Sequence, residues 1–147
     1  MNYVTSQITQ LRIAELNSLD PINVMIEDLE PGKGRITITC YGSAWVAYRG
    51  GMGGKTISQF FCSSDEDYLA KNLSEIDQHQ IDYEKISLDL GEEVCKENIY
   101  FHEDQMELLY GDIACRQLPR EINPCYAYLC RIIKAVQQAL EDLGNWE

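Results

Sequence analysis

The most suggestive stretch for chemistry is a glycine-rich loop, Gly50-Gly51-Met52-Gly53-Gly54-Lys55-Thr56. Gly-Lys-Thr ends the phosphate-binding loop, whose backbone amides and lysine hold nucleotide phosphates. That loop needs a further glycine five residues before the Gly-Lys pair, and position 49 is an arginine. It also follows a parallel strand, whereas the residues before this loop follow a hairpin pattern. We therefore expect a turn from a strand into a helix capped by Thr56, not a nucleotide site.

Acidic residues offer a second kind of chemistry. The chain has 24 Asp and Glu against 12 Lys and Arg, and residues 61–110 hold fourteen of these acids but only three lysines. Such a surface repels phosphate backbones, which argues against direct nucleic-acid binding. It suits solubility or docking onto a basic protein surface. Converging carboxylates could also hold Mg²⁺ or act as a catalytic pair, and the candidates are Asp65, Glu66, Asp67, Glu92, Glu93, Glu103 and Asp104.

Cysteine and histidine show no metal-binding or catalytic pattern. None of the six cysteines forms a Cys-x-x-Cys pair, and neither His79 nor His102 adjoins a cysteine. The sequence therefore predicts no metal and no cofactor. No nucleophile, base and orienting group can be named together, which favours a non-enzymatic protein. The absence of a long apolar run and of secretory-signal features predicts a cytoplasmic protein with reduced thiols and no membrane contact.

Trp45, Arg49 and Met52 form another candidate group, because these residue types are enriched at the centres of protein interfaces. On a strand, Trp45 and Arg49 share one face and Tyr48 takes the other, so only one set is exposed. Two interpretations stay open, a contact surface and an aromatic core strand. The predicted partner-binding set joins these residues with the acids and comprises Trp45, Arg49, Met52, Asp65, Glu66, Asp67, Glu92 and Glu93.

The elements that would position these residues follow from hydrophobic periodicity. Residues 6–19 have helical spacing and end before Pro21. Residues 22–27 and 35–40 alternate around a Pro-Gly turn, which predicts a β-hairpin, and residues 44–49 add a third strand. Short helices should begin at Thr56 and at Ser63 or Ser64. A long helix should begin at Pro124 and end at Gly144, with its apolar stripe formed by Leu129, Ile132, Ile133, Val136, Leu140 and Leu143.

This order predicts an α+β protein with a small three-stranded antiparallel sheet and helices on one face. We expect a single domain over residues 1–147, because that length is typical of one domain. Residues 77–120 are a possible variable insertion, within which residues 103–116 have helical spacing. The element order is similar to that of the double-stranded RNA-binding fold, but acids at 65–67 stand where that fold presents lysines.

Four motifs carry a resemblance, and they are residues 36–45, Gly51-Met52-Gly53, Gln59-Phe60-Phe61 and Asp67-Tyr68-Leu69-Ala70. A weaker similarity lies in residues 128–132. With these motifs the chain resembles small, largely uncharacterised accessory proteins encoded by phages and prophages of enteric bacteria. The resemblance implies a bacterial cytoplasm and a phage accessory gene of the early or defence-related kind. It carries over no catalytic residue.

Two classes of function follow as hypotheses. The preferred one is a non-enzymatic phage accessory protein that binds a host or phage protein, as a defence inhibitor or a host-takeover factor. The alternative is an acidic nucleic-acid mimic or a Mg-dependent nucleic-acid-processing protein. Mimicry predicts one continuous stripe of acids, and nuclease chemistry predicts three carboxylates converging on one point. A plain oligomerisation module is a third possibility, and the sequence leaves the oligomeric state open.

Overall fold

A computed structural model describes residues 1–111 and 118–144 of the chain. It divides into two compact units. Unit 1 comprises residues 1–76 and 125–147, and unit 2 comprises residues 77–124. The segment interpreted from sequence as an insertion, residues 77–120, therefore falls entirely within unit 2.

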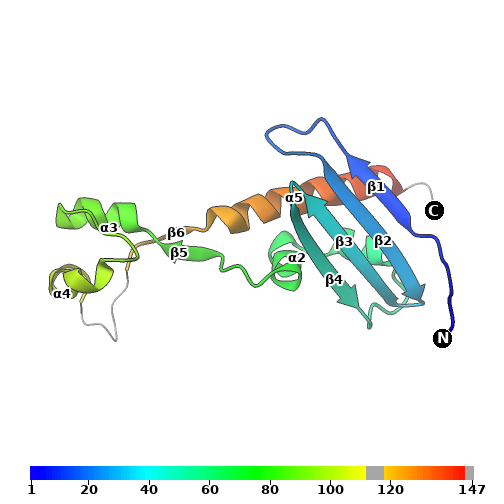
Figure 1. Cartoon of the computed structure of the whole chain (residues 1–147), viewed down its shortest axis with the longest axis horizontal. Coiled ribbons are helices and arrows are strands. Elements are labelled where there is room, and N and C mark those ends of the chain that lie inside the picture. Colours follow the sequence, from blue (N-terminus) through cyan, green and yellow to red (C-terminus); the bar gives the residue numbers. More distant parts are fainter. Residues whose placement is uncertain (112–117, 145–147) are drawn as a thin grey trace. The chain divides into compact units, whose positions relative to one another are not determined.

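Unit 1 is built on a four-stranded antiparallel sheet whose strands pair in chain order (Figure 1). The strands are β1 (Thr9–Ile13), β2 (Ile22–Glu30), β3 (Lys33–Cys40) and β4 (Ser43–Arg49). Val24 lies opposite Leu11 on one side and Ile38 on the other, so apolar side chains from three strands share one face. The expected α+β class is confirmed, but the sheet has four strands and not three.

The helix expected over residues 6–19 is wrong, because this segment supplies β1 and a loop. Its apolar residues fit a helical spacing, but Leu11 and Ile13 also alternate with polar neighbours. In the sheet, Leu11 and Ile13 pair with Val24 and Ile22 and pack against the core. Pairing with a fully apolar strand face outweighs a local helical pattern, which is a weak prior on its own.

The β3–β4 hairpin closes through a turn that demands unusual backbone angles. Tyr41 has φ 45° and Gly42 has φ 79°. Two consecutive positive φ values are typical of the type I′ turn, whose twist matches that of the paired strands. This turn sets the register that places Trp45 opposite Ile38.

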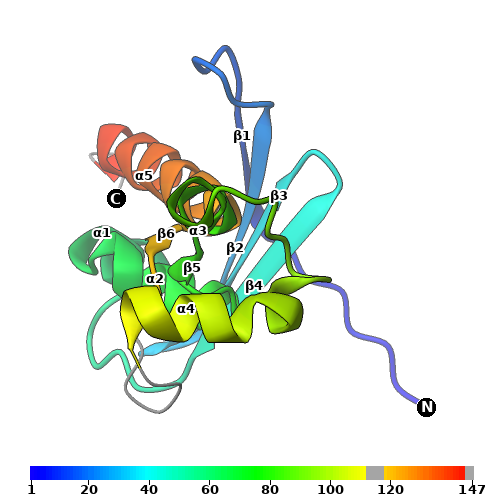
Figure 2. The same cartoon turned by 90° about the vertical axis from the view of Figure 1, so that its left-hand side faces the viewer.

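Three helices cover one face of the sheet in unit 1 (Figure 2). They are α1 (Ile57–Ser63), α2 (Glu66–Leu73) and α5 (Pro124–Asp142). The expected stripe of α5 is confirmed for Leu129, Ile132, Ile133, Val136 and Leu140, which are buried, but Leu143 lies beyond the end of the helix and is 42% exposed. The start of α2 is corrected, because its cap is Asp65 and not Ser63 or Ser64.

Unit 2 is smaller and its core is small. A two-stranded antiparallel ribbon, β5 (His79–Ile81) with β6 (Arg120–Ile122), leads to α3 (Tyr83–Leu90), the 3₁₀ turn η1 (Ile99–His102) and α4 (Glu103–Tyr110). In the described part of this unit, the buried core consists of Ile86, Val94 and Met106. The helix expected over residues 103–116 is present up to Tyr110, and residues 112–117 lie outside the described part. No helix within residues 1–111 and 118–144 is long and apolar enough to cross a bilayer.

Each unit contains an aspartate that accepts hydrogen bonds from a lysine and a tyrosine. Asp67 accepts from Lys71 at 2.8 Å and from the Tyr126 hydroxyl, and Asp89 accepts from Tyr110 at 2.6 Å and Lys85 at 2.9 Å. The bond from Lys71 lowers the pKa of Asp67, with Tyr126 as the second cause. Desolvation, followed by the Asp89 carboxylate, raises the pKa of Tyr110 to about 12.

We expect these aspartates to make the protein acid-sensitive. The pKa of Asp67 is lower in the folded chain than its ordinary value of 3.8, so Asp67 contributes stability above pH 3.8. That contribution disappears as the pH falls through the folded pKa. Thermal unfolding followed from pH 7 down to pH 2.5 should therefore show a smaller acid-induced loss of Tm for Asp67→Asn than for the natural chain. Asp77→Asn, at an exposed aspartate, is the control, and an equal effect of the two substitutions would contradict this account.

Candidate protein-binding surface

The aromatic strand candidates lie on the covered face of the sheet. Trp45 pairs with Ile38, which is fully buried, and Trp45 itself packs against the core while partly exposed. Arg49 shares this face, as the strand periodicity predicts, and Val46 and Tyr48 lie on the open face with about half of their surface exposed. The structure thus places Trp45 with the core, not in an exposed patch.

Arg49 is held inside unit 1 by two aromatic rings. Its guanidinium carbon lies 5.5 Å from the ring centre of Phe60 and 5.2 Å from that of Tyr68. The two rings meet edge to face at 6.2 Å. A cation at these distances is attracted by the electron-rich ring faces. Arg49 therefore links β4 to α1 and α2.

Met52 and the glycine loop also have structural roles. Met52 is 8% exposed, and its amide donates to the carbonyl of Gly32 at 3.0 Å, which closes the loop against the β2–β3 turn. Burial leaves little of the Met52 side chain at the surface. The expected cap at Thr56 is confirmed. The first amide of α1, at Ile57, donates to the Asp28 carboxylate at 2.9 Å, so a carboxylate stands at the place a phosphate would need.

The three acids at the start of α2 are engaged within unit 1. Asp65 caps the helix by accepting from the Tyr68 amide at 2.8 Å. Glu66 pairs with Lys134 of α5 at 3.3 Å. Asp67 has the lysine and tyrosine partners described above. These contacts assign the three acids to holding α2 in place.

Glu92 and Glu93 lie in a different setting, on the rim of a shallow hollow in unit 2. The hollow has a volume of about 440 Å³ and is lined by Glu84, Ser87, Leu88, Gly91, Glu92 and Glu93. Leu88 is 75% exposed, whereas Ile86, two residues earlier on α3, is fully buried. Gly91 ends α3 with φ 72° and turns the chain, so Glu92 and Glu93 follow the end of the helix closely. We call this set the acidic hollow.

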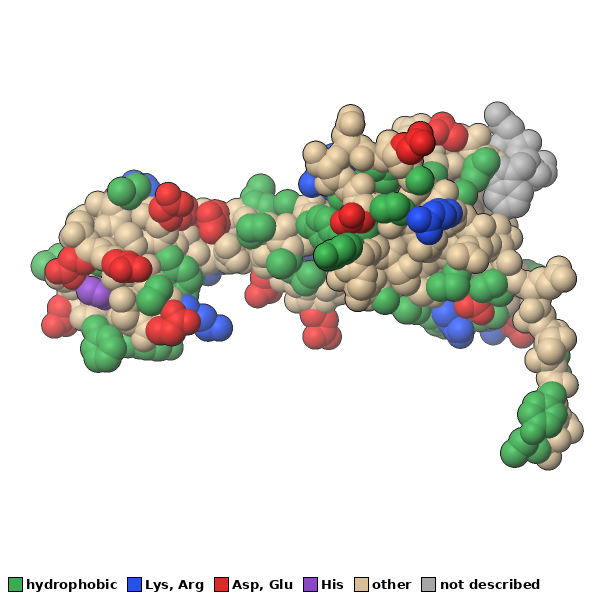
Figure 3. All heavy atoms as spheres, turned by 45° about the horizontal axis from the view of Figure 1, so that its top comes forward, with side chains coloured by type: hydrophobic (Ala, Val, Ile, Leu, Met, Phe, Trp, Pro, Cys, Tyr) green, Lys and Arg blue, Asp and Glu red, His purple; other side chains and the backbone are tan. Residues whose placement is uncertain are grey.

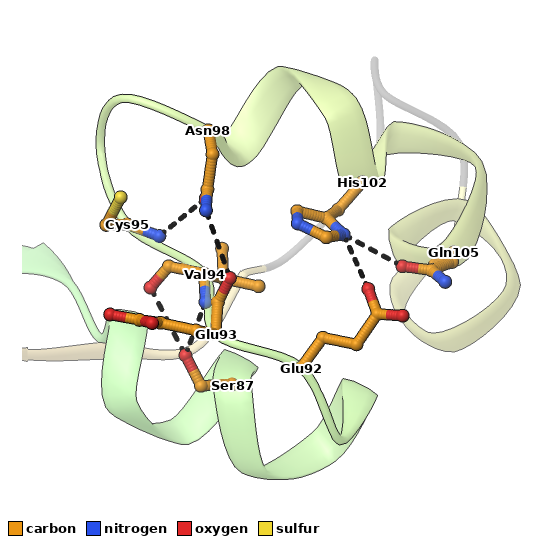
Figure 4. Close-up of polar contacts among 8 residues, drawn as sticks. All are labelled: Ser87, Glu92, Glu93, Val94, Cys95, Asn98, His102 and Gln105. Atoms are coloured by element: carbon orange, nitrogen blue, oxygen red, sulfur yellow. Dashed lines mark hydrogen bonds and ion pairs between the residues drawn. The ribbon is translucent and has the colours of Figure 1, made fainter.

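The loop that carries these glutamates is fixed by side-chain hydrogen bonds (Figure 4). The Ser87 hydroxyl accepts from the Val94 amide at 2.9 Å. Asn98 accepts from the Cys95 amide at 2.7 Å and donates to the carbonyl of Glu93 at 3.0 Å. Bonds from side chains to backbone hold a loop in one conformation without a large core. The positions of Glu92 and Glu93 are therefore set by the fold of unit 2.

His102 anchors the Glu92 carboxylate. Its Nδ1 lies 3.2 Å from Glu92 and 3.0 Å from the side-chain oxygen of Gln105 (Figure 4). The His102 side chain is only 15% exposed, whereas the Glu92 side chain is 53% exposed. Glu92 is thus steadied by His102 from the protein side while much of its surface faces solvent.

The acidic hollow has the chemistry of a receptor for a basic side chain. A lysine or arginine can lay its apolar stem on Leu88 and place its charged end among the carboxylates. The wider surface has the same character, since unit 2 holds twelve acids against four Lys or Arg. Figure 3 shows acidic and hydrophobic side chains interspersed over this part of the molecule. Across residues 1–111 and 118–144, no group of three or more His, Cys, Asp or Glu is arranged to hold a metal ion.

Sequence reasoning found two of the three rim glutamates and missed the residues that complete the hollow. Glu84 and Leu88 were overlooked, although they are four residues apart and therefore lie on one side of a helix. That spacing becomes informative only once residues 83–90 are known to be helical. The structure divides the predicted partner-binding set between the two units. Unit 1 holds Trp45, Arg49, Met52 and residues 65–67, and unit 2 holds Glu92 and Glu93.

Comparisons with known proteins give one match over residues 1–142 and another over 73 residues. A family model described as a phage family, Phage_phiTE_072, matches residues 1–142. A stretch of 73 residues is 34% identical to the GTPase Obg of Heliobacterium modesticaldum. That stretch is 48% of the chain but only 16% of the length of the GTPase. No solved structure matches the chain significantly.

Proposed function

We propose, from the premise that the chain belongs to this phage protein family, that it is a non-enzymatic accessory protein. It binds a host or phage protein through unit 2, and the bound partner presents a basic surface. The enteric host and the role against a defence system or in host takeover, suggested by sequence resemblance, are part of this proposal.

One observation carries it. The acidic hollow combines an exposed leucine and Glu84 on α3 with Glu92 and Glu93 on a loop held in place by Ser87, Asn98 and His102. Exposed apolar side chains among ordered charges are typical of protein contact sites. Leu88 adds an apolar contact beside these charges, which a surface of acids alone does not offer.

The same observation favours protein contact over imitation of a nucleic acid. A phosphate mimic needs a continuous line of negative charge, whereas the acids of unit 2 are interrupted by exposed Leu88, Tyr100, Phe101 and Leu108. Nucleotide chemistry of the kind named for the Obg relative is not part of the proposal. The glycine loop of this chain leads into an α1 whose first amide is already bonded to Asp28.

Affinity capture with matched charge variants tests the proposal. We compare the natural chain with Glu84→Gln/Glu92→Gln/Glu93→Gln, using tagged protein in bacterial lysate with and without nuclease treatment. We expect the triple variant to lose the main captured protein by roughly tenfold, because each removed carboxylate weakens pairing with a basic group. Quantitative mass spectrometry measures the ratio.

The control is Glu15→Gln/Glu75→Gln/Glu141→Gln, which removes the same charge at exposed positions of unit 1. Capture by this control should equal that of the natural chain. Equal loss of capture in both triple variants would mean that capture depends on net charge and not on the acidic hollow. Unchanged capture in both would remove the acidic hollow as the contact site, and capture that disappears with nuclease treatment would favour a nucleic-acid function.

A further inference from the structure

Unit 2 contains a second space, on the side of its core that η1 and α4 form. This cavity has a volume of about 260 Å³ and is lined mainly by Ile81, Tyr83, Ile99, Tyr100, Met106 and Leu118. Met106 is one of the buried core residues, so the cavity reaches the core of unit 2. Two charged residues, Lys96 and Glu103, complete the lining. An apolar cavity of roughly 150 Å³ already takes a benzene ring, so this one has room for a leucine or phenylalanine side chain.

Two aromatic residues at and beside the cavity are far more exposed than core residues usually are. Tyr100 is 77% exposed and its neighbour Phe101 is 87% exposed. Among residues 77–111 and 118–124, the buried core consists of the three side chains Ile86, Val94 and Met106. Domains of this small size rarely bury enough apolar surface for high stability and commonly gain it from a partner or a staple. The structure of unit 2 is therefore that of a domain with room for one more core side chain.

The charges around the cavity indicate which kind of partner segment can bind there. Glu103, Asp104 and Glu107 lie on α4 beside the exposed aromatic residues, and unit 2 as a whole is strongly acidic. We infer that the cavity receives an apolar anchor side chain of the protein partner, carried on an amphipathic segment with Lys or Arg beside the anchor. This inference rests on the proposed function and adds the partner's chemistry. The partner then adds a large apolar side chain beside Met106 in the core of unit 2.

Synthetic peptides added to the full chain test this inference. The first is an amphipathic helical peptide of leucine and lysine, the second replaces its leucines by serine, and the third replaces its lysines by glutamate. Calorimetric titration should show the first binding roughly tenfold more tightly than either of the others. Hydrogen exchange at the amides of Ile86 and Val94 should slow when the first peptide is bound, because binding only to the folded unit suppresses its opening.

Two tyrosine variants locate the binding. Tyr100→Ser should weaken the first peptide roughly fivefold, because it removes a wall of the cavity at an exposed position that does not hold the fold together. Tyr41→Ser is the matched control, since Tyr41 is an 83% exposed tyrosine in a turn of unit 1, and it should leave binding unchanged. Failure of the leucine–lysine peptide to bind, or binding that ignores Tyr100 and leaves exchange unchanged, overturns the inference.

The outcomes separate this inference from the proposed function. Peptide binding that is reduced by the Glu84, Glu92 and Glu93 substitutions but not by Tyr100→Ser would reject the anchor cavity and keep the acidic hollow. Lysate capture that ignores all three glutamates would reject the proposed contact site, whatever the peptides do.

Discussion

Leu129→Ala is expected to lower the free energy of unfolding of unit 1 by about 2 to 5 kcal/mol. Leu129 is fully buried on the face of α5 that covers the sheet, among Ile132, Ile133 and Val136. Truncation removes the transfer free energy of three carbon atoms and leaves a cavity that a close-packed core only partly fills. Urea unfolding followed by tryptophan fluorescence measures the loss, because Trp45 packs against the core of unit 1 and residues 77–124 contain no tryptophan.

Leu88→Ala is the matched comparison, since it makes the same chemical change at a side chain that is 75% exposed. A leucine with most of its surface in water gives up little on truncation, so we expect a change within about 0.5 kcal/mol. Similar losses in the two variants would mean that α5 does not form the core described for unit 1. A change in the urea slope, without a change in midpoint, would point to the unfolded state instead.

Replacing residues 79–122 by Asn-Gly is expected to abolish partner capture and leave unit 1 folded. The carbonyl of Gln78 accepts from the amide of Asn123 at 2.8 Å. That bond is the one that closes a two-residue hairpin, and Asn-Gly is the dipeptide such turns prefer. Unit 1 keeps its sheet and its three helices, so the tryptophan-monitored unfolding transition should remain cooperative. Capture should fall to background because the acidic hollow and the anchor cavity are both gone.

Two results would contradict this expectation in different ways. Full capture by the shortened chain would place the contact surface on unit 1. Loss of the cooperative transition would show that unit 1 depends on unit 2 for its stability. A version with Gly-Gly in place of Asn-Gly separates a poor turn from a real dependence, because both dipeptides close such hairpins.

The sequence predicted the parts of the fold that local pattern determines. Alternation predicted strands at β2 to β4, Thr56 marked the start of α1, and five of the six predicted stripe residues of α5 are buried, Leu143 being the exception. It did not predict β1, because the apolar residues around Leu11 satisfy both a helical and an alternating pattern. The pairing of Leu11 with Val24, a contact between two strands that local sequence does not show, decides between the two patterns.

The sequence also predicted only part of the candidate binding surface, because residue type and charge do not show which face of the fold a side chain occupies. Charge counting pointed to Glu92 and Glu93, and residue type pointed to Arg49 and Met52. Arginine and methionine are enriched at interfaces but also serve inside a fold, as Arg49 does between Phe60 and Tyr68. Type alone cannot separate these uses, because the difference lies in which face of β4 the helices cover. Glu84 and Leu88 became visible only through the helical phase of α3.

The position of α5 in the chain has a consequence for how the protein is made. The sheet pairs only neighbouring strands, so its contacts are local and can form early during synthesis. The stripe that covers the sheet lies at residues 129–140, after all of unit 2. Unit 2 therefore leaves the ribosome before the core of unit 1 can close, and until α5 follows only α1 and α2 can cover the apolar face of the sheet. Slow synthesis of residues 77–124 would lengthen the interval in which a chaperone is needed.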